Sequence, residues 1–382
     1  MFTRIYLHIP FCRKKCPYCA FFSQEPSAGD IERYVRLVCE EMLHHSHTVT
    51  AHADVDSIYF GGGTPSLLEP RHVGELLEQT AGLFRLAPEV EITLETNPGT
   101  VDLRKLSGFR QAGVNRLSLG VQSFDDRMLA TLGRIHTSRQ AQAAFASARK
   151  ARFDNIGIDL IHSLPGQTPE MWRTDLEHAI KLAPEHLSVY GLTIEPETPF
   201  AARYPEENTQ LPDQDLSAEM FEAADDLLTL QGYEHYEIAN YALPGRSSRH
   251  NSGYWHRDGC LGLGAGAHSF LRDTDFGTRS CNPGNLSTYA ASLRNGVSAS
   301  EEVVALTRDD AVSEFMFLGL RMADGVTFPA FREAFGIELK DMFGRQVDDL
   351  ISQQLLTEHA SGIRLTRRGM LLSNHVFRMF LT

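Results

Sequence analysis

Short apolar runs rich in β-branched residues alternate with amphipathic stretches over the first 195 residues of this chain. The predicted strands are residues 5–9, 57–60, 90–96, 116–121, 156–161 and 187–194. The predicted helices between them are residues 30–45, 69–84, 102–112, 139–152 and 169–182. Because each strand leads into a helix, the order favours parallel βαβ units, which right-handed crossovers curl into a barrel or part of one. The sequence therefore predicts an α/β fold built on a partial (β/α)6 barrel of the TIM type.

The remainder of the chain is patterned differently. A helix is expected at 213–231, and residues 233–283 are rich in glycine, histidine and aromatic residues without a clear period. The C-terminal part predicts helices at 308–322, 328–335 and 340–353, a hairpin at 355–365 and a closing helix at 367–380. We therefore expect a barrel over 1–235, an irregular segment over 236–295 that covers it, and a mainly helical, winged-helix-like domain over 296–382.

Composition narrows the class of protein. No apolar run approaches the ~20 residues needed to cross a bilayer, and the N-terminus lacks the apolar core of a secretory signal, so we expect a cytoplasmic protein. A net charge of −13 disfavours nucleic acid as a partner. This charge also disfavours a DNA-binding role for the C-terminal domain through Arg364, Arg367 and Arg368. Six cysteines in 382 residues are too few for a disulfide scaffold.

Three of the cysteines, Cys12, Cys16 and Cys19, lie together in a C-x3-C-x2-C spacing. Iron–sulfur cubanes are usually held by four thiolates, so a set of three would leave one iron open to a chelating small molecule. The basic residues 13–15 would offset the negative charge of a thiolate-bound cluster. Zinc is the alternative, because His8 could supply the fourth ligand that it prefers.

Small and polar residues follow the ends of the predicted strands, where a βα barrel carries its chemistry. The glycines at 61–63 would let backbone pass close to a ligand, although a flexible turn is the plainer interpretation. Glu95 and Asp159 would need a cation or hydroxyl donors if they are buried, and Arg134 would need an anion. A ligand with ribose hydroxyls and a carboxylate would satisfy all three, as would salt bridges among the residues themselves.

Residues 249–255 read Arg-His-Asn-Ser-Gly-Tyr-Trp, and a glycine-rich run follows at 262–270. A histidine with two aromatic neighbours, such as His250, can ligate haem iron while the rings pack against the porphyrin. Core packing under a loop is the alternative, and it is the commoner role of a lone histidine.

Taken together, the motifs resemble the radical S-adenosylmethionine (SAM) enzymes, specifically the oxygen-independent coproporphyrinogen III oxidase-like group. The resemblance covers essentially the whole chain and is carried by residues 8–12, 61–66, 95–98, 117–124 and 156–167. It implies that Cys12, Cys16 and Cys19 hold a [4Fe–4S] cluster whose fourth iron is chelated by SAM, which reductive cleavage would convert to a 5′-deoxyadenosyl radical. By matching motif positions, it also implies a SAM site lined by Tyr6, Tyr18, Gly62, Gly63, Thr64, Glu95, Gln122, Arg134, Asp159 and Thr193.

Two branches of this group differ near the cluster. Coproporphyrinogen dehydrogenases have a longer N-terminal arm and another cysteine two residues beyond the third, where this chain has Phe21. The haem chaperone (HemW) branch lacks that cysteine. It carries the motif H-N-x-x-Y-W, which is matched here by His250, Asn251, Tyr254 and Trp255. That branch usually has aspartate after the third cysteine, and this chain departs from it with Ala20.

The resemblance therefore implies a haem chaperone that binds haem or a related tetrapyrrole and delivers it to apo-haemoproteins, especially respiratory ones. It implies a radical SAM core without coproporphyrinogen dehydrogenase activity. The alternatives are radical decarboxylation of coproporphyrinogen III to protoporphyrinogen IX, a step of porphyrin biosynthesis, and another radical reaction on a tetrapyrrole. No transmembrane segment is expected, a peripheral contact with a membrane is left open, and both a monomer and a homodimer fit.

Overall fold

The computed structural model describes residues 1–48, 54–205, 208–272, 275–294 and 299–381. Six parallel strands form the centre of its large sheet: β1 (Arg4–Ile9), β2 (Val55–Gly62), β3 (Leu86–Thr96), β4 (Arg116–Gln122), β5 (Ile156–His162) and β6 (His186–Gly191). Each strand pairs in parallel with the next one along the chain. The predicted partial barrel is therefore confirmed, although β6 ends at Gly191 rather than at residue 194.

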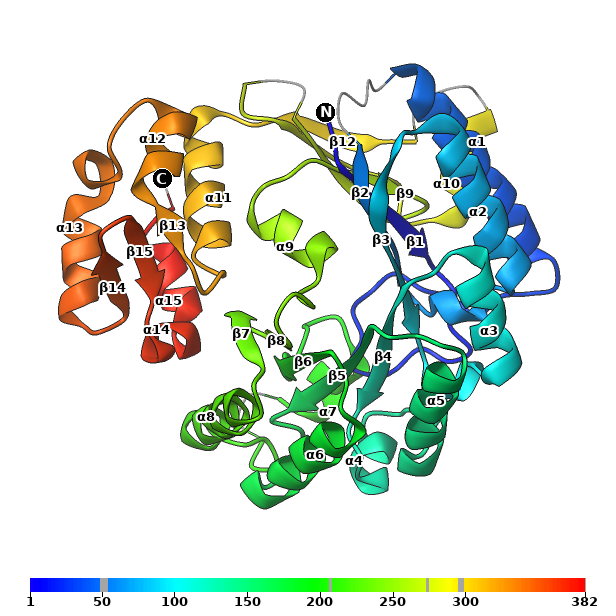
Figure 1. Cartoon of the computed structure of the whole chain (residues 1–382), viewed down its shortest axis with the longest axis horizontal. Helices are drawn as coiled ribbons and strands as arrows, with labels where there is room; N and C mark the ends of the chain where they lie inside the picture. Colours follow the sequence, from blue (N-terminus) through cyan, green and yellow to red (C-terminus); the bar gives the residue numbers. More distant parts are fainter. Residues whose placement is uncertain (49–53, 206–207, 273–274, 295–298, 382) are drawn as a thin grey trace.

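Helices connect these strands and lie outside the curved sheet (Figure 1). They are α1 (Asp30–Thr48), α2 (Pro70–Leu83), α3 (Leu103–Ala112), α4 (Asp126–Thr131), α5 (Ser138–Lys150) and α6 (Pro169–Leu182). Side-chain caps explain where several of them begin: Asp102 accepts from the backbone N–H of Lys105, and Thr168 accepts from that of Met171. Two short 3-10 turns, Pro65–Leu67 and Pro98–Thr100, follow β2 and β3, and α7 (Pro199–Arg203) and α8 (Gln214–Leu230) follow β6.

The strands present apolar side chains to the helices and polar side chains to the barrel interior. Leu94, Leu117 and Ile158 belong to the apolar core. Their neighbours in sequence, Glu95, Ser118 and Asp159, line an internal cavity instead. Side chains alternate between the two faces of a strand, so the inner face carries these polar side chains while the outer face carries the apolar ones. Unlike the branched aliphatic filling typical of a TIM barrel, this interior can receive a polar ligand.

Further strands extend the sheet at both edges. At one edge β9 (Cys260–Leu263) pairs in parallel with β1, and β10 (His268–Leu271), β11 (Thr278–Cys281) and β12 (Glu301–Ala305) follow antiparallel. At the other edge β8 (Asn240–Ala242) pairs with β6, and β7 (Glu234–Glu237) pairs with β8.

The expectation of an irregular segment over 236–295 is therefore wrong. This segment contains β8, α9 (Arg249–Trp255), β9, β10, β11 and α10 (Leu286–Arg294). Strands of three or four residues are too short to show a period in the sequence, which explains why they were not predicted. The expected boundary between 295 and 296 falls outside the described residues.

The C-terminal domain has its own apolar core, which includes Phe331, Phe343 and Val347. Its elements are α11 (Arg308–Gly319), β13 (Val326–Thr327), α12 (Phe328–Phe335), α13 (Leu339–Ser352), β14 (Leu356–His359), β15 (Gly362–Leu365), α14 (Arg367–Leu371) and α15 (Ser373–Arg378). Helices followed by an antiparallel hairpin agree with the winged-helix-like prediction. The single closing helix at 367–380 is wrong, because the backbone leaves helical geometry at Leu372, with ψ of 25°.

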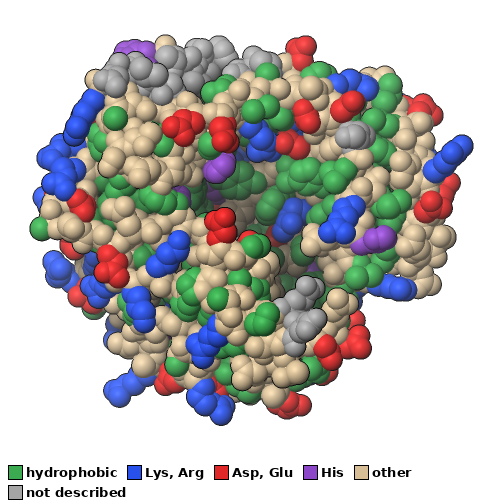
Figure 2. Space-filling model, turned by 180° about the vertical axis from the view of Figure 1, so that it is seen from behind, with side chains coloured by type: hydrophobic (Ala, Val, Ile, Leu, Met, Phe, Trp, Pro, Cys, Tyr) green, Lys and Arg blue, Asp and Glu red, His purple; other side chains and the backbone are tan. Residues whose placement is uncertain are grey.

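The C-terminal domain lies beside the barrel, with α11 nearest to it (Figure 1). The opposite face of the molecule is hollowed near its centre, and hydrophobic, basic and acidic side chains meet around the hollow (Figure 2). Among the described residues, the helices are all too short or too polar to span a bilayer.

Candidate cofactor site

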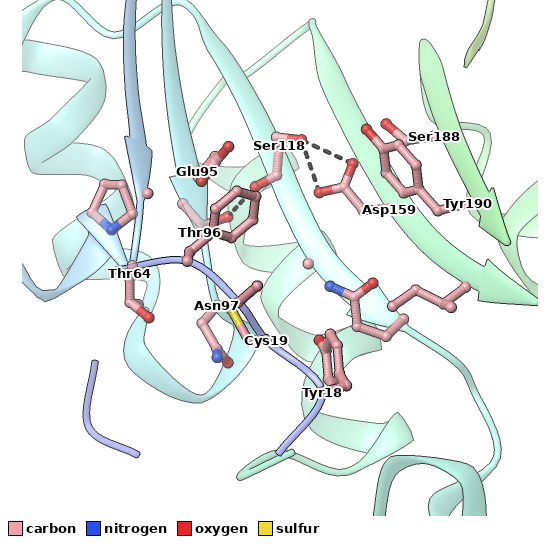
Figure 3. Close-up of a pocket in the computed structure, with 18 of the residues that line it drawn as sticks. Tyr18, Cys19, Thr64, Glu95, Thr96, Asn97, Ser118, Asp159, Ser188 and Tyr190 are labelled. Carbon is pink, nitrogen blue, oxygen red and sulfur yellow. Dashed lines mark hydrogen bonds between the residues drawn. The ribbon is translucent and has the colours of Figure 1, made fainter. Parts of the chain in front are cut away.

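A cavity of about 530 Å³ opens at the carboxyl ends of the barrel strands, within the size range of small-molecule sites. Cys19 lies on the loop that crosses the cavity, opposite Glu95, Ser118 and Asp159 (Figure 3). The residues predicted for SAM or haem that line this cavity are Tyr18, Gly62, Gly63, Thr64, Glu95, Gln122, Arg134, Asp159, Thr193 and Asn251. The structure thus brings together residues from β2, β3, β4, β5, α9 and several loops that lie far apart in sequence.

The cysteine loop follows β1 and is fixed by its neighbours. Cys12, Cys16 and Cys19 are all partly buried and form no disulfide. The hydroxyl of Thr64 lies 3.4 Å from the Cys12 sulfur, and a guanidinium nitrogen of Arg134 lies 3.7 Å from the Cys16 sulfur. Both groups are donors, and donors stabilise thiolates rather than thiols.

The arrangement of these sulfurs bears on which metal could bind. In the part of the chain that the structure describes, no three His, Cys, Asp or Glu side chains converge on one ion. A cubane does not require such convergence, because each of three thiolates binds a different iron. The donors around the sulfurs and the cavity beside Cys19 therefore fit a cluster with one open iron.

The glycines at the end of β2 also allow close packing within the protein. A Cβ on Gly63 would lie 2.7 Å from the Phe11 carbonyl oxygen, and one on Gly62 would lie 2.5 Å from the His8 ring. Gly62 also has φ of +105°, which L side chains rarely adopt. The absent Cβ atoms thus allow the end of β2 to pack against the His8 ring and the start of the cysteine loop.

Two carboxylates face the cavity, and each receives a hydroxyl hydrogen bond. Tyr59 donates to Glu95 at 2.8 Å, and Ser118 donates to Asp159. Burial inside the barrel raises the pKa of Glu95 to about 7, although the Tyr59 hydrogen bond acts in the opposite direction. Burial also raises the pKa of Asp159. Among the described residues, neither carboxylate forms an ion pair with Arg134, so the alternative of mutual salt bridges does not hold.

Two polar groups at the cavity keep unused hydrogen-bonding capacity. Arg134 donates to the Gly120 carbonyl oxygen at 2.7 Å, but its Nε atom has no partner among the described residues. The Oε1 atom of Gln122 is likewise buried without a partner in this part of the chain. Gln122 also has φ of 70°, a strained conformation that is commonest at functional sites. Buried polar groups normally have partners, so these atoms fit a polar ligand in the cavity.

Sequence reasoning missed several cavity residues, namely Tyr59, Arg116, Ser118, Ser188 and Tyr190. Arg116 is only 1% exposed, and its Nε atom has no partner within the described residues. The signal that could have identified them is the alternation of polar and apolar residues within β4 to β6, which an aliphatic barrel interior would not show.

The H-N-x-x-Y-W residues lie on α9, near the amino ends of the barrel strands. Only Asn251 among them reaches the cavity. The His250 ring is buried, with Nδ1 2.9 Å from the Ser57 hydroxyl and Nε2 2.9 Å from the Tyr254 hydroxyl. Trp255 packs under the Arg321 guanidinium, 4.3 Å from its ring centroid. A haem iron could bind His250 only if one ring nitrogen gave up its hydroxyl partner and the buried ring became accessible, so the haem-ligating role stays a prediction.

Tyr6 also lies outside the residues that line the cavity. Its hydroxyl is 3.1 Å from Nδ1 of His8, and its ring stacks on that of Tyr59. It therefore supports a cavity residue, and its own contact with SAM stays a prediction.

Comparison with known proteins shows the family of the chain. Residues 6–179 match the Radical SAM superfamily, and residues 306–372 match the HemN C-terminal domain. The chain is 37% identical to the heme chaperone HemW of Lactococcus lactis, over 98% of this chain and 96% of that protein. It belongs to the HemW family of radical SAM proteins.

Further members and a solved structure extend this assignment. The chain is 36% identical to the HemW protein of Escherichia coli, over 99% of this chain and 97% of that protein. It superposes on the E. coli coproporphyrinogen III oxidase HemN with a TM-score of 0.86 and 26% identity, over 100% of this chain and 90% of that one. This chain and HemN thus share one fold, comprising the barrel and the C-terminal domain.

Proposed function

We propose that this protein is a haem chaperone that binds haem or a related tetrapyrrole and delivers it to apo-haemoproteins, including respiratory ones. The observation that carries the proposal is the similarity over nearly the full length to proteins named heme chaperone HemW, from organisms as different as Lactococcus lactis and Escherichia coli. The similarity includes the C-terminal domain as well as the barrel, so it is not limited to the part that all radical SAM proteins share.

The cofactors proposed for the barrel are a [4Fe–4S] cluster and SAM. Cys12, Cys16 and Cys19 would hold the cluster, and the hydrogen bonds that Thr64 and Arg134 donate to the sulfurs of Cys12 and Cys16 would stabilise it. Bound there, a cluster with an open iron supplies a chelation site for SAM and an electron for it. The residues proposed to surround SAM are Tyr18, Gly62, Gly63, Thr64, Glu95, Gln122, Arg134, Asp159 and Thr193.

Phe21 favours a carrier over a coproporphyrinogen dehydrogenase. Its side chain is 66% exposed and lines the mouth of the cavity, at the position where the dehydrogenase branch would have a further cysteine. An exposed aromatic ring offers a flat apolar surface, on which a macrocycle can stack, in place of a reactive thiol.

The dehydrogenase is the second candidate, because the chain shares its fold with HemN over its whole length. One assay separates the two functions. The protein, reconstituted anaerobically with iron and sulfide, is supplied with SAM, a reductant and coproporphyrinogen III. We expect no protoporphyrinogen; its formation would replace the chaperone proposal with the catalytic one.

The chaperone proposal is tested by hemin titration followed by transfer. We expect a saturable shift of the Soret band with purified protein, and transfer of the haem to an apo-haemoprotein such as apomyoglobin when the two are mixed. A Phe21→Ala variant should bind hemin more weakly, whereas Leu230→Ala, which removes an exposed side chain from α8, should bind it normally. Absence of a saturable shift in the unaltered protein would refute the proposal.

A further inference from the structure

Three aromatic rings pack together at the boundary between α9 and the barrel interior. The His250 ring stacks on Tyr59, with centroids 4.9 Å apart and planes inclined by 27°. Tyr6 lies against the same pair, 6.2 Å from Tyr59 and 6.3 Å from His250. The side chain of Tyr59 is therefore held between a strand neighbour and the helix that closes this end of the barrel.

The far end of Tyr59 reaches the cofactor cavity. Its hydroxyl donates to the Glu95 carboxylate at 2.8 Å, and both residues line the cavity. A phenol ring is rigid, so the position of the ring decides where its hydroxyl lies. The Tyr59–Glu95 hydrogen bond thus depends on what supports the ring.

His250 is itself fixed firmly enough to give that support. Its two ring nitrogens lie 2.9 Å from the Ser57 and Tyr254 hydroxyls, and its backbone N–H donates to Glu91. Burial lowers the pKa of His250 well below its usual value, which keeps the ring neutral. A neutral imidazole has one donor and one acceptor nitrogen, and two hydroxyls can satisfy both.

We propose that His250 is a positioning residue for the cofactor site, acting through Tyr59 on the Glu95 carboxylate. The inference rests on the proposed SAM site, in which Glu95 would accept a hydrogen bond from the ligand. It assigns the histidine of the H-N-x-x-Y-W motif to the support of SAM binding rather than to ligation of haem iron. Two ends of the barrel are thereby coupled through one side chain.

A double-mutant cycle on SAM affinity tests this coupling. The variants are His250→Gln, which keeps hydrogen-bonding groups but cannot stack, Tyr59→Phe, and the two combined. The dissociation constant of SAM is measured by equilibrium dialysis with anaerobically reconstituted protein. Loss of a hydrogen bond to a charged group should weaken binding about tenfold or more in Tyr59→Phe, and His250→Gln should weaken it by about three- to tenfold.

The combined variant decides the outcome. If His250 acts through Tyr59, the combined variant should bind SAM no more weakly than Tyr59→Phe alone. Additive effects would overturn the inference, because two independent contributions multiply in the dissociation constant. His256→Gln, an exposed change immediately after α9, is the matched control and should leave SAM affinity unchanged.

Two further measurements separate this role from a general effect on folding. Iron content and thermal midpoint are recorded for each variant. If His250→Gln folds poorly, His250→Phe restores a ring against Tyr59 and should keep SAM affinity near that of the unaltered protein. Loss of affinity in a well-folded His250→Phe would contradict the inference.

Failure of this inference is distinguishable from failure of the proposed function. If the unaltered, cluster-loaded protein does not bind SAM, the proposed cofactor site itself is wrong. If it binds SAM and the cycle is additive, only the positioning role is wrong. A hemin titration adds a third outcome: a Soret shift lost in His250→Gln, with SAM affinity unchanged, would overturn the positioning role in favour of haem ligation.

Discussion

The hydroxyl of Ser118 lies 3.0 Å from both carboxylate oxygens of Asp159. The two residues come from neighbouring strands, β4 and β5, and both face the cofactor cavity. Burial raises the pKa of Asp159, and hydrogen bonds from Ser188 and Ser118 oppose that rise by stabilising the ionised form. Ser118 therefore helps to keep an acceptor available to the hydroxyl groups of a ligand.

Replacing Ser118 with alanine should expose this contribution. Without the hydroxyl the pKa of Asp159 rises further, so a larger fraction of the carboxyl group is protonated and unable to accept two hydrogen bonds. We expect SAM to bind about three- to tenfold more weakly, with its pH dependence moved to higher pH. Equilibrium dialysis over a pH series measures both effects. Ser352→Ala, at the exposed end of α13, is the control, and an unchanged pH dependence in Ser118→Ala would contradict the assignment.

Glu95 should make the stability of the protein depend on pH. Burial raises its pKa to about 7 from the usual 4.5, so the folded state binds this proton more tightly than the unfolded state. The resulting stabilisation is fully present at pH values below the pKa of Glu95 in the unfolded state. It is lost as the pH rises through the pKa of Glu95 in the folded state. The contribution of Glu95 to the free energy of unfolding should change by on the order of 2–3 kcal/mol, a figure reduced because the side chain contacts the cavity.

The variant Glu95→Gln removes that titration while keeping an oxygen that accepts from Tyr59. The free energy of unfolding of the variant, minus that of the unaltered protein, should become more favourable to the variant as the pH rises from about 5 to about 8. Other titrating groups cancel in this difference because both proteins contain them. Urea denaturation of the cluster-free proteins at the two pH values provides the measurement, and a difference independent of pH would contradict the raised pKa.

Gly63 should tolerate no side chain. A Cβ there would meet the backbone of the cysteine loop at 2.7 Å, so Gly63→Ala must displace either β2 or the loop. We expect most of the bound iron to be lost after reconstitution, and the thermal midpoint to fall. Gly82→Ala is the matched control, because a Cβ at Gly82 in α2 would meet nothing within 4 Å. That variant should keep its iron and gain about 0.5–1 kcal/mol from the better helix propensity of alanine.

The stability of the C-terminal domain should be independent of SAM and iron binding at the cofactor site. Phe331 is fully buried in the apolar core of that domain and contacts the rings of Phe315, Phe335 and Phe343. Phe331→Ala should destabilise this domain by about 3–5 kcal/mol. We expect SAM affinity and iron content to stay unchanged. Calorimetry and dialysis on the same preparation check both statements, and a parallel loss of SAM binding would show that the two parts act as one.

The sequence predicted the central strands well because their apolar faces are continuous and amphipathic helices connect them. It predicted poorly wherever a strand is short: β8, with three residues, and β9, with four, show no period and are held by pairing with β6 and β1. Pairing with strands that are distant in sequence determines the conformation of such segments, and the local sequence pattern does not show this pairing.

At the site, motif positions identified the residues at the rim, such as Glu95 and Gln122, because they stand at strand ends. The inner residues Tyr59 and Arg116 were missed, since their role depends on which strand face is enclosed. For His250 the sequence was incomplete in another way. Its neighbours in sequence suggested that it ligates haem iron, but its hydrogen-bond partners Ser57 and Glu91 come from strands far away in the chain. Only the folded chain shows that this ring is enclosed.

The central claim, that three cysteines hold a cluster with one open iron, is tested by metal and sulfide analysis combined with electron paramagnetic resonance. The unaltered protein, reconstituted without oxygen, should contain iron and sulfide in the ratio of a [4Fe–4S] cluster, and the spectrum of the reduced cluster should change when SAM is added. Replacing Cys12, Cys16 and Cys19 by serine should abolish both. Bound zinc, an absence of metal, or a cluster that survives the triple replacement would contradict the account.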